Sequence, residues 1–346
     1  MHTGLNTDNL PRPRLVVHAD WSLNSRKRWM AMAVLDSSGN YFVKDLENAG
    51  DSRTLLARLR AAAGERSCVL VGFDFPIGLP LAYAQKRGIT SFIEFLTWSN
   101  QEDWQEFFNV ATSPGEISFR RPFYPYRPGS SRQIHLMDAL GMEHLDQLRR
   151  TCELGSSTRR PACPLFWTMG GQQVGKAAIH GWRDVLIPAL LDRRKANQTK
   201  IWPFSGFFND LLSTDDTVIA ETYPAEFYTH LGIDLRFADP GLQVPATTLK
   251  HEKSGKRSQA SRKANAAVLF GWAESHSVRL RSSLKEYIIN GFGPRGSTED
   301  EFDALVGLFG ILNIILGDRP AYDSEENTIT SIEGWILGQD LRQSPV

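Results

Sequence analysis

The chain has 346 residues, which is enough for one large domain or two smaller ones and for a substantial buried core. Lysine and arginine together number 39, as do aspartate and glutamate, so the molecule has no net field that would attract or repel nucleic acid as a whole. Its three cysteines form no CxxC pair, which argues against a disulfide framework or a structural zinc site and favours a reducing cytoplasm.

Two segments bear on targeting. Residues 1–14 are polar and contain prolines, with no apolar stretch behind a basic start, so they predict a flexible tail and not a secretory signal. The longest apolar stretch, residues 304–317, is too short to span a bilayer. We therefore expect a soluble cytoplasmic protein that does not interact with membranes.

The first part of the chain predicts a sheet that begins as a meander. Two short apolar runs joined by the turn at 36–40 indicate a hairpin, and a leucine-rich stretch then predicts a crossover helix. The helix leads into a further strand, which we expect to be parallel to the first. The predicted elements are strands at 15–20, 29–35 and 41–46, a helix at 52–63 and a strand at 69–74.

The rest of the chain predicts mainly helices. Residues 81–208 alternate helical patterns with segments rich in proline, glycine and arginine, and we interpret them as an insertion that packs over the sheet. The sheet is expected to resume at 217–223. Further helices are predicted at 225–231, at 264–276 and from Thr298 to about Leu316. We expect a single domain over residues 15–338.

Acidic residues follow the apolar runs in a regular way. Three runs end in Asp20, Asp74 and Glu221, and Asp300 and Asp303 open the last helix. Ligands of parallel sheets bind beyond the carboxyl ends of the strands, so these acids are expected to meet at one edge. Carboxylates that converge repel one another unless a cation lies between them, which predicts a site for Mg²⁺ or Mn²⁺.

Each acid also has a simpler interpretation. Asp20 can cap the turn after its strand, and Asp300 lies in a first helical turn, where the helix dipole stabilises acids without any site. Glu221 can form a salt bridge to the insertion as readily as it can complete the acidic set. Asp74 and Asp303 are harder to explain in this way, because both lie in strongly apolar surroundings where an unpaired charge is costly. The small residues Ala304 and Gly307 should let the last helix approach the sheet closely.

Basic residues could supply a local field beside this site. The segment from 250 to 263 is strongly basic, and its candidates for contacts with substrate phosphates are Lys256, Arg257, Arg262 and Lys263. A solvated loop and helix start would have the same composition. The stretch 170–177 nearly matches a phosphate-binding loop, but Ala177 replaces the hydroxyl residue that would hold magnesium, so we interpret the match as accidental.

The order of three meandering strands, a helix, a strand, a helical insertion, a strand and helices matches a ribonuclease H-like architecture: a mixed five-strand sheet flanked by helices. The sequence Asp-Glu-Phe-Asp-Ala-Leu at 300–305 is similar to the D-x-x-D-A-L signature of RuvC-type Holliday-junction resolvases. Together with the motifs around Asp20, at 73–80 and at 221–224, it resembles the domain-of-unknown-function 429 group, predicted nucleases of the same superfamily. The motifs at 202–204 and 333–338 also resemble that group.

This resemblance implies a metal-dependent nuclease that acts on DNA or RNA. Asp20 would bridge two metal ions about 3.5 to 4 Å apart, Asp74 and Asp303 would each anchor one, and Glu221 or Asp300 would complete the shell. Two alternatives remain open at this stage. One is a nucleic-acid-binding module that has lost catalysis, and the other is an actin-like ATPase or phosphotransferase with a related strand order.

Overall fold

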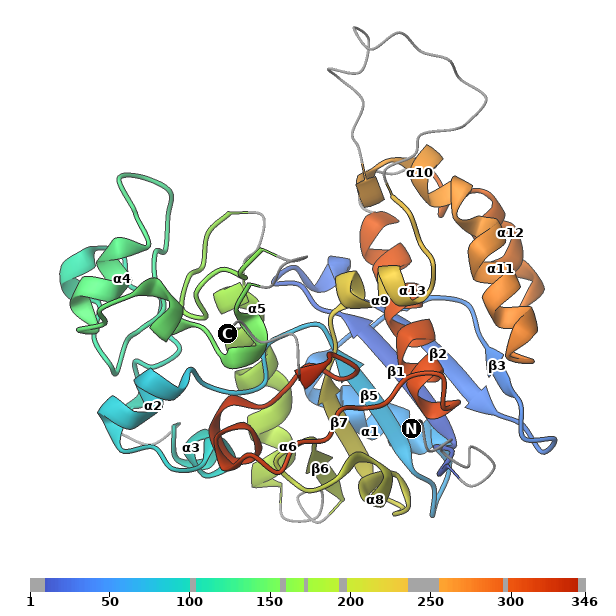
Figure 1. Ribbon diagram of the computed structural model, residues 1–346, viewed down its shortest axis with the longest axis horizontal. Helices are drawn as coiled ribbons and strands as arrows, with labels where there is room; N and C mark the ends of the chain where they lie inside the picture. Colours follow the sequence, from blue (N-terminus) through green and yellow to red (C-terminus); the bar gives the residue numbers. More distant parts are fainter. Residues whose placement is uncertain are drawn as a thin grey trace, which may run out of the picture.

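The computed structural model describes residues 10–99, 104–155, 160–170, 174–192, 198–235, 255–294 and 298–341. Within them, a mixed eight-stranded sheet forms the centre and helices cover both of its faces (Figure 1). The strands are β1 (Leu15–Asp20), β2 (Trp29–Leu35), β3 (Tyr41–Val43), β4 (Glu47–Asn48), β5 (Val69–Phe73), β6 (Thr199–Ile201), β7 (Thr217–Glu221) and β8 (Arg279–Leu280).

Three groups of helices surround the sheet. The first is the crossover helix α1 (Ser52–Ala63). The second belongs to the insertion: α2 (Leu81–Arg87), α3 (Phe92–Trp98), α4 (Ile134–Ala139), α5 (Val174–Gly181) and α6 (Ile187–Leu191). The third comprises α8 (Phe208–Leu212), α9 (Pro224–His230), α10 (Gln259–Ala264), α11 (Ala266–Ser275), α12 (Ser282–Ile289) and α13 (Thr298–Ile315).

The strands lie in the order β6-β7-β5-β1-β2-β3-β8, and the short β4 pairs with β2. β1, β2 and β3 form an antiparallel meander, whereas β5 and β7 run parallel to β1. The meander, the crossover helix α1 and the parallel β5 confirm the predictions for the first part of the chain. The helix predicted from Thr298 is also confirmed as α13.

Several predicted boundaries were wrong. The sheet has eight strands and not five, because β4, β6 and β8 are only two or three residues long and too short for an alternating pattern. β6 lies inside the range assigned to the insertion, so the sheet resumes at Thr199. The strand β3 ends at Val43, and the helix predicted at 264–276 is confirmed as α11 (Ala266–Ser275), which α10 precedes.

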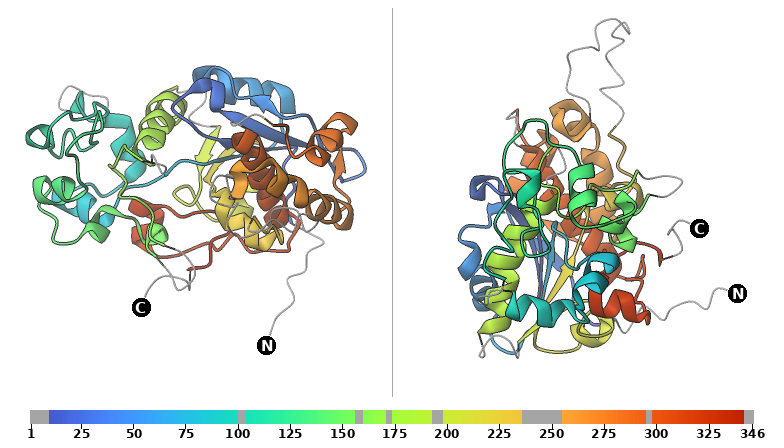
Figure 2. Two further views of the ribbon diagram at one scale, coloured as in Figure 1. Left: turned by 90° about the horizontal axis from the view of Figure 1, so that it is seen from above. Right: turned by 90° about the vertical axis from the view of Figure 1, so that its left-hand side faces the viewer.

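Two apolar cores lie on opposite faces of the sheet. Val16, Leu70 and Val218 face the core formed with α9, α11 and α13, whereas their neighbours Val17, Val71 and Ile219 face the core formed with α1, α6 and the insertion. This alternation follows from the two-residue period of strands. Figure 2 shows α1 and α6 on one side of the sheet and α13 on the other.

Helix α13 determines the position of the late acidic residues. All but two of its residues are buried, and it crosses β1 and β2 beside α9 (Figure 1). A Cβ built on Gly307 would lie 2.3 Å from the His18 ring, so only glycine permits this approach. The close packing expected from the small residues of this helix is therefore confirmed. No helix among the described residues is both long and apolar enough to cross a membrane.

Candidate functional site

Two of the predicted acids lie side by side where β1 and β5 end. The parallel register pairs Ala19 with Phe73, so Asp20 and Asp74 follow at the same level and on the same face of the sheet. This is the face that α13 covers. The first turns of α13 bring Asp300 and Asp303 to the same place, and all four side chains line one cleft.

The carboxylates of Asp20 and Asp74 lack compensating donors. Asp20 is 8 % exposed, and within the described chain neither residue accepts a hydrogen bond from a backbone amide, lysine or arginine. Burial, reinforced by Asp303, Asp74 and Asp300, raises the pKa of Asp20 well above its usual value. Burial and Asp303 raise the pKa of Asp74 to about 7, against the opposing effect of Lys256. Burial and the neighbouring carboxylates thus disfavour the charged form of both groups.

Asp303 is the most buried of the four acids and the best held. Its side chain is 2 % exposed. The Tyr228 hydroxyl donates to Oδ1, and the Lys256 ammonium forms an ion pair with Oδ2. Burial raises the pKa of Asp303, while Lys256 and Tyr228 oppose that rise. Tyr228 and Lys256 thus fix the orientation of this carboxylate.

Asp300 lies one helical turn before Asp303 at the edge of the cluster. Its Oδ2 atom is buried and has no hydrogen-bond partner. Burial raises the pKa of Asp300 to about 6, although Lys27 and Lys256 lower it. An unpartnered carboxylate oxygen next to three other acids is suited to a ligand that carries positive charge.

Glu221 also lines the cleft and contributes to the raised pKa of Asp74, but its side chain is held by different partners. β7 pairs with β5 so that Glu221 lies level with Phe73, one residue before Asp74, and its side chain therefore points to the opposite face. There Arg150 of the insertion binds both of its oxygens at 2.6 Å, and the Ile77 amide donates to one of them. The salt bridge to the insertion, which the sequence left open, is the arrangement in the structure.

The basic candidates separate into different roles. Arg257 pairs with Glu299 at the edge of the cleft, and Lys263 is exposed outside the cleft. Arg262 is 1 % exposed and donates to the carbonyl groups of Gly291 and Gly293, so the prediction that it contacts phosphate was wrong. Residues 250–254 of the predicted basic segment lie outside the described residues, as do residues 1–9 of the predicted tail and residues 171–173 of the stretch that resembles a phosphate-binding loop.

The acids lie in a cleft of about 560 Å³. The insertion contributes the cations Arg160 and Lys176 to its lining, and the region beside α13 contributes Tyr228, Lys256 and Arg257. Neither Arg160 nor Lys176 makes an ion pair within the described chain. The cleft therefore combines an acidic centre with basic groups from both neighbouring regions.

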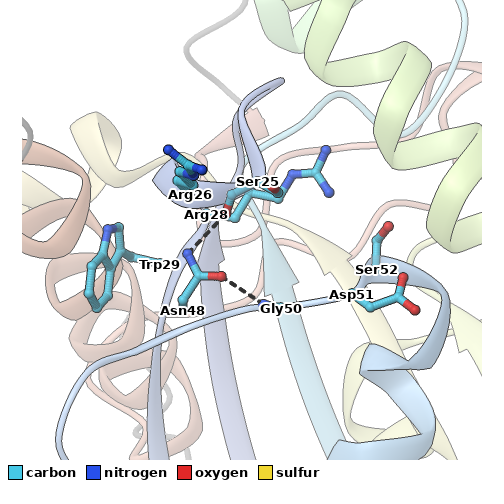
Figure 3. A pocket seen from close by; sticks show the side chains of 8 residues that line it. All are labelled: Ser25, Arg26, Arg28, Trp29, Asn48, Gly50, Asp51 and Ser52. Carbon is cyan, nitrogen blue, oxygen red and sulfur yellow. Dashed lines mark hydrogen bonds between the residues drawn. The ribbon is translucent and has the colours of Figure 1, made fainter.

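A second hollow, of about 540 Å³, lies beside the start of α1 (Figure 3). Asn48 donates to the Ser25 carbonyl and accepts from Gly50 there, and Asp51 caps α1 by accepting from the Arg53 amide. Asn48 and Asp51 thus have partners within the fold. It holds no cluster of buried acids comparable to that of the first cleft.

The donor set of the acidic cleft fits a divalent cation. Four carboxylates converge, and among the described side chains the ammonium of Lys256 is the one cationic group that bonds to any of them. Oxygen ligands of this kind are those that Mg²⁺ and Mn²⁺ prefer. As the described side chains stand, however, no three His, Cys, Asp or Glu residues are arranged to ligate a single ion. The carboxylates would have to move closer together to hold one.

Comparison with known proteins adds no relative. No family model matches the sequence, and neither curated proteins nor solved structures give a match.

Two side chains that hold the acids, Arg150 and Tyr228, were not predicted from the sequence. Arg150 and Glu221 are 71 residues apart, and Tyr228 lies 75 residues before Asp303, so no local spacing links them. The sequence holds a weak signal for Tyr228. This residue lies one helical turn after Pro224, the first residue of α9, and α9 follows a strand that ends near the acids.

Proposed function

We propose that this protein is a metal-dependent nuclease that hydrolyses phosphodiester bonds. One observation carries the proposal: Asp20, Asp74 and Asp303 come from three distant parts of the sequence and meet at one strand end without enough positive charge to balance them. Assembling such a cluster costs stability unless a ligand compensates. A pair of divalent cations is the usual ligand for this arrangement.

The strand order supports a ribonuclease H-like interpretation. Five central strands run β3-β2-β1-β5-β7, with the first three antiparallel and the last two parallel to β1. The acids lie at the end of β1, just after β5 and on the late helix α13, which are the positions that the resemblance implies. The additional strands β4, β6 and β8 extend this core at its margins.

The residues suit Mg²⁺ or Mn²⁺ in distinct roles. Asp20 interacts with Asp74, Asp300 and Asp303, so it would hold the ions together with these residues. Asp74 and Asp303 would each anchor one, with Asp300 beside them. When bound, such ions supply the charge that activates a water molecule and stabilises the leaving oxygen. Tyr228 holds the Asp303 carboxylate in its orientation, and no side-chain nucleophile is needed.

The basic lining of the cleft suits a phosphate-rich substrate. Arg160 and Lys176 on the insertion, and Lys256 and Arg257 near α13, could contact phosphates on either side of the acidic centre. Nucleic acid is therefore the proposed substrate, and its binding should weaken as salt concentration rises.

Cleavage assays with a matched pair of variants test this proposal. The wild type is incubated with Mg²⁺ or Mn²⁺ and a panel of single-stranded, double-stranded, hybrid and branched nucleic acids. Asp303→Asn should lower the rate at least about 100-fold, because it removes a charge that anchors metal. Asp138→Asn, which changes an exposed acid on α4, should leave the rate unchanged.

Each outcome distinguishes the candidates. Metal-dependent cleavage that is lost only in Asp303→Asn supports the nuclease, whereas equal cleavage by both variants indicates a contaminant. Binding without cleavage by the wild type would favour a catalytically inactive nucleic-acid-binding module. Stabilisation by ATP would favour an ATPase, although the residues after β1, Trp21-Ser22-Leu23-Asn24, lack the glycine-rich phosphate turn of that class.

A further inference from the structure

Lys256 has an unusual position for a residue expected to bind substrate. Its ammonium pairs with Asp303 Oδ2 and also interacts with Asp20 and Asp74, so it lies among the carboxylates and not simply at the edge of the cleft. Burial would lower the pKa of Lys256, but Asp303, Asp20 and Asp74 together raise it above its usual value. The side chain is nevertheless 44 % exposed, which leaves it a route to the mouth of the cleft.

The backbone around Lys256 is fixed by buried contacts. Lys256 lies in a short 3-10 helix, Gly255–Arg257. Arg262 donates to the Lys256 carbonyl and also to the hydroxyl of Thr298, the first residue of α13. The segment that carries the ammonium is thereby attached to the helix that carries Asp303. A flexible side chain on a fixed backbone can exchange one partner for another without refolding.

We infer that Lys256 is an internal counter-ion of the acidic cluster, that a divalent cation displaces it from Asp303, and that the freed ammonium then contacts a phosphate of the substrate. This inference rests on the proposed function. An ammonium and a metal ion on the same carboxylate oxygen share its lone pairs and repel each other, so a metal ion on Oδ2 weakens the hold of this oxygen on Lys256. Tyr228 stays on Oδ1 and keeps the carboxylate oriented during the exchange.

The exchange would couple metal loading to substrate binding. While Lys256 pairs with Asp303, its ammonium is not available to a phosphate. The pair partly neutralises the charge of the acidic cluster and so stabilises it. With metal bound, the ammonium becomes available beside Arg257 and the opposite wall of Arg160 and Lys176. A phosphate would then meet the greatest positive charge only in metal-loaded protein. A purely structural ion pair would show no such dependence.

Labelling of the wild-type protein tests the exchange directly. The protein is treated with an amine-acylating reagent with and without Mn²⁺, and modification is quantified by mass spectrometry of peptides. Labelling of Lys256 should rise severalfold when Mn²⁺ is added, because the ion pair that shields the amine is broken. Lys285, which is exposed on α12, serves as the internal reference and should not change.

A pair of variants tests the coupling. Lys256→Met should bind Mn²⁺ about tenfold more tightly in isothermal titration, because no internal cation has to leave, and should raise KM for the nucleic acid. Arg257→Met removes a neighbouring positive charge whose partner is Glu299 and should change Mn²⁺ affinity much less. Improved metal binding together with impaired substrate binding is a signature that a merely structural lysine would not give.

The outcomes separate this inference from the proposed function. If Mn²⁺ binds but Lys256 labelling and the metal affinity of Lys256→Met are unchanged, the exchange is refuted and the nuclease proposal stands. If labelling rises and metal affinity improves while the wild type cleaves no nucleic acid, the exchange of metal for Lys256 is retained and the nuclease proposal fails. If the wild type binds no Mn²⁺ at all, both are wrong.

Discussion

Two groups of buried carboxylates lie at the same end of the sheet, on its opposite faces, and they are balanced very differently. On the insertion side, Glu221 and Glu153 both bond to Arg150, and Glu333 accepts from Leu81 and Thr151. On the α13 side, Asp20 and Asp74 receive no comparable donors from the described part of the chain, where Asp303 is held by Lys256 and Tyr228.

This difference indicates which acids serve the fold and which await a ligand. A buried acid with all its hydrogen bonds satisfied stabilises its surroundings as long as its partner is present. A group of buried acids without compensating positive charge or hydrogen bonds destabilises the folded protein. Such a group is tolerated where a bound ligand supplies the compensation. The comparison therefore assigns Glu221 to the attachment of the insertion, and it supports the proposed role of the aspartates as ligands of a cation.

The largest effect is expected from breaking the balanced group. Arg150→Met leaves Glu221 and Glu153 buried without their cation and should reduce the free energy of unfolding by about 3 to 5 kcal/mol, as measured by urea denaturation. Arg281→Met, which disrupts an exposed pair with Asp45, should cost less than about 1 kcal/mol. Equal losses in the two variants would mean that Arg150 does not hold the insertion in place.

Removing a carboxylate from the aspartate group should instead increase the free energy of unfolding. In metal-free protein, Asp74 has a pKa of about 7 against the ordinary value of 3.8, so between those values the folded state holds a proton that the unfolded state has lost. Its contribution to stability therefore falls as pH rises through this window. Asp74→Asn removes that loss and should gain roughly 2 to 3 kcal/mol over the wild type between pH 5 and pH 8.

The difference between the variant and the wild type reports on Asp74 together with Asp20, whose pKa Asp74 raises. Burial lowers the pKa of His18 to about 3, so this residue makes stability rise with pH up to about its unfolded pKa of 6.5. That opposing contribution is present in both proteins and cancels in the difference. A difference that stays constant from pH 5 to pH 8, with a chelator present, would contradict the uncompensated state of Asp74.

The sequence predicted more of the aspartate group than of the balanced one. Runs that end in acids indicated Asp20 and Asp74, and the small residues of the last helix indicated its close approach to the sheet. Glu221 was grouped with them because strand register cannot be read from one sequence, and a shift of one residue moves a side chain to the other face. The partners Arg150 and Lys256 reach their acids over 71 and 47 residues, distances at which no periodic pattern operates.

The smallest effect is expected from a change at the close contact between α13 and β1, which positions the aspartate group. Gly307 lies one helical turn after Asp303, and a Cβ there would come within 2.3 Å of the buried His18 ring. Gly307→Ala should therefore cost about 1 to 3 kcal/mol in the free energy of unfolding and, by pushing the helix from the strand, should separate Asp303 from Asp20 and weaken Mn²⁺ binding. Gly271 on α11 has open space around it, so Gly271→Ala should instead stabilise the protein by about 0.5 to 1 kcal/mol and leave metal binding unchanged. If Gly307→Ala bound Mn²⁺ as tightly as the wild type, the aspartates would not depend on this helix contact, and the geometry that sets them apart from the balanced group would have to arise elsewhere.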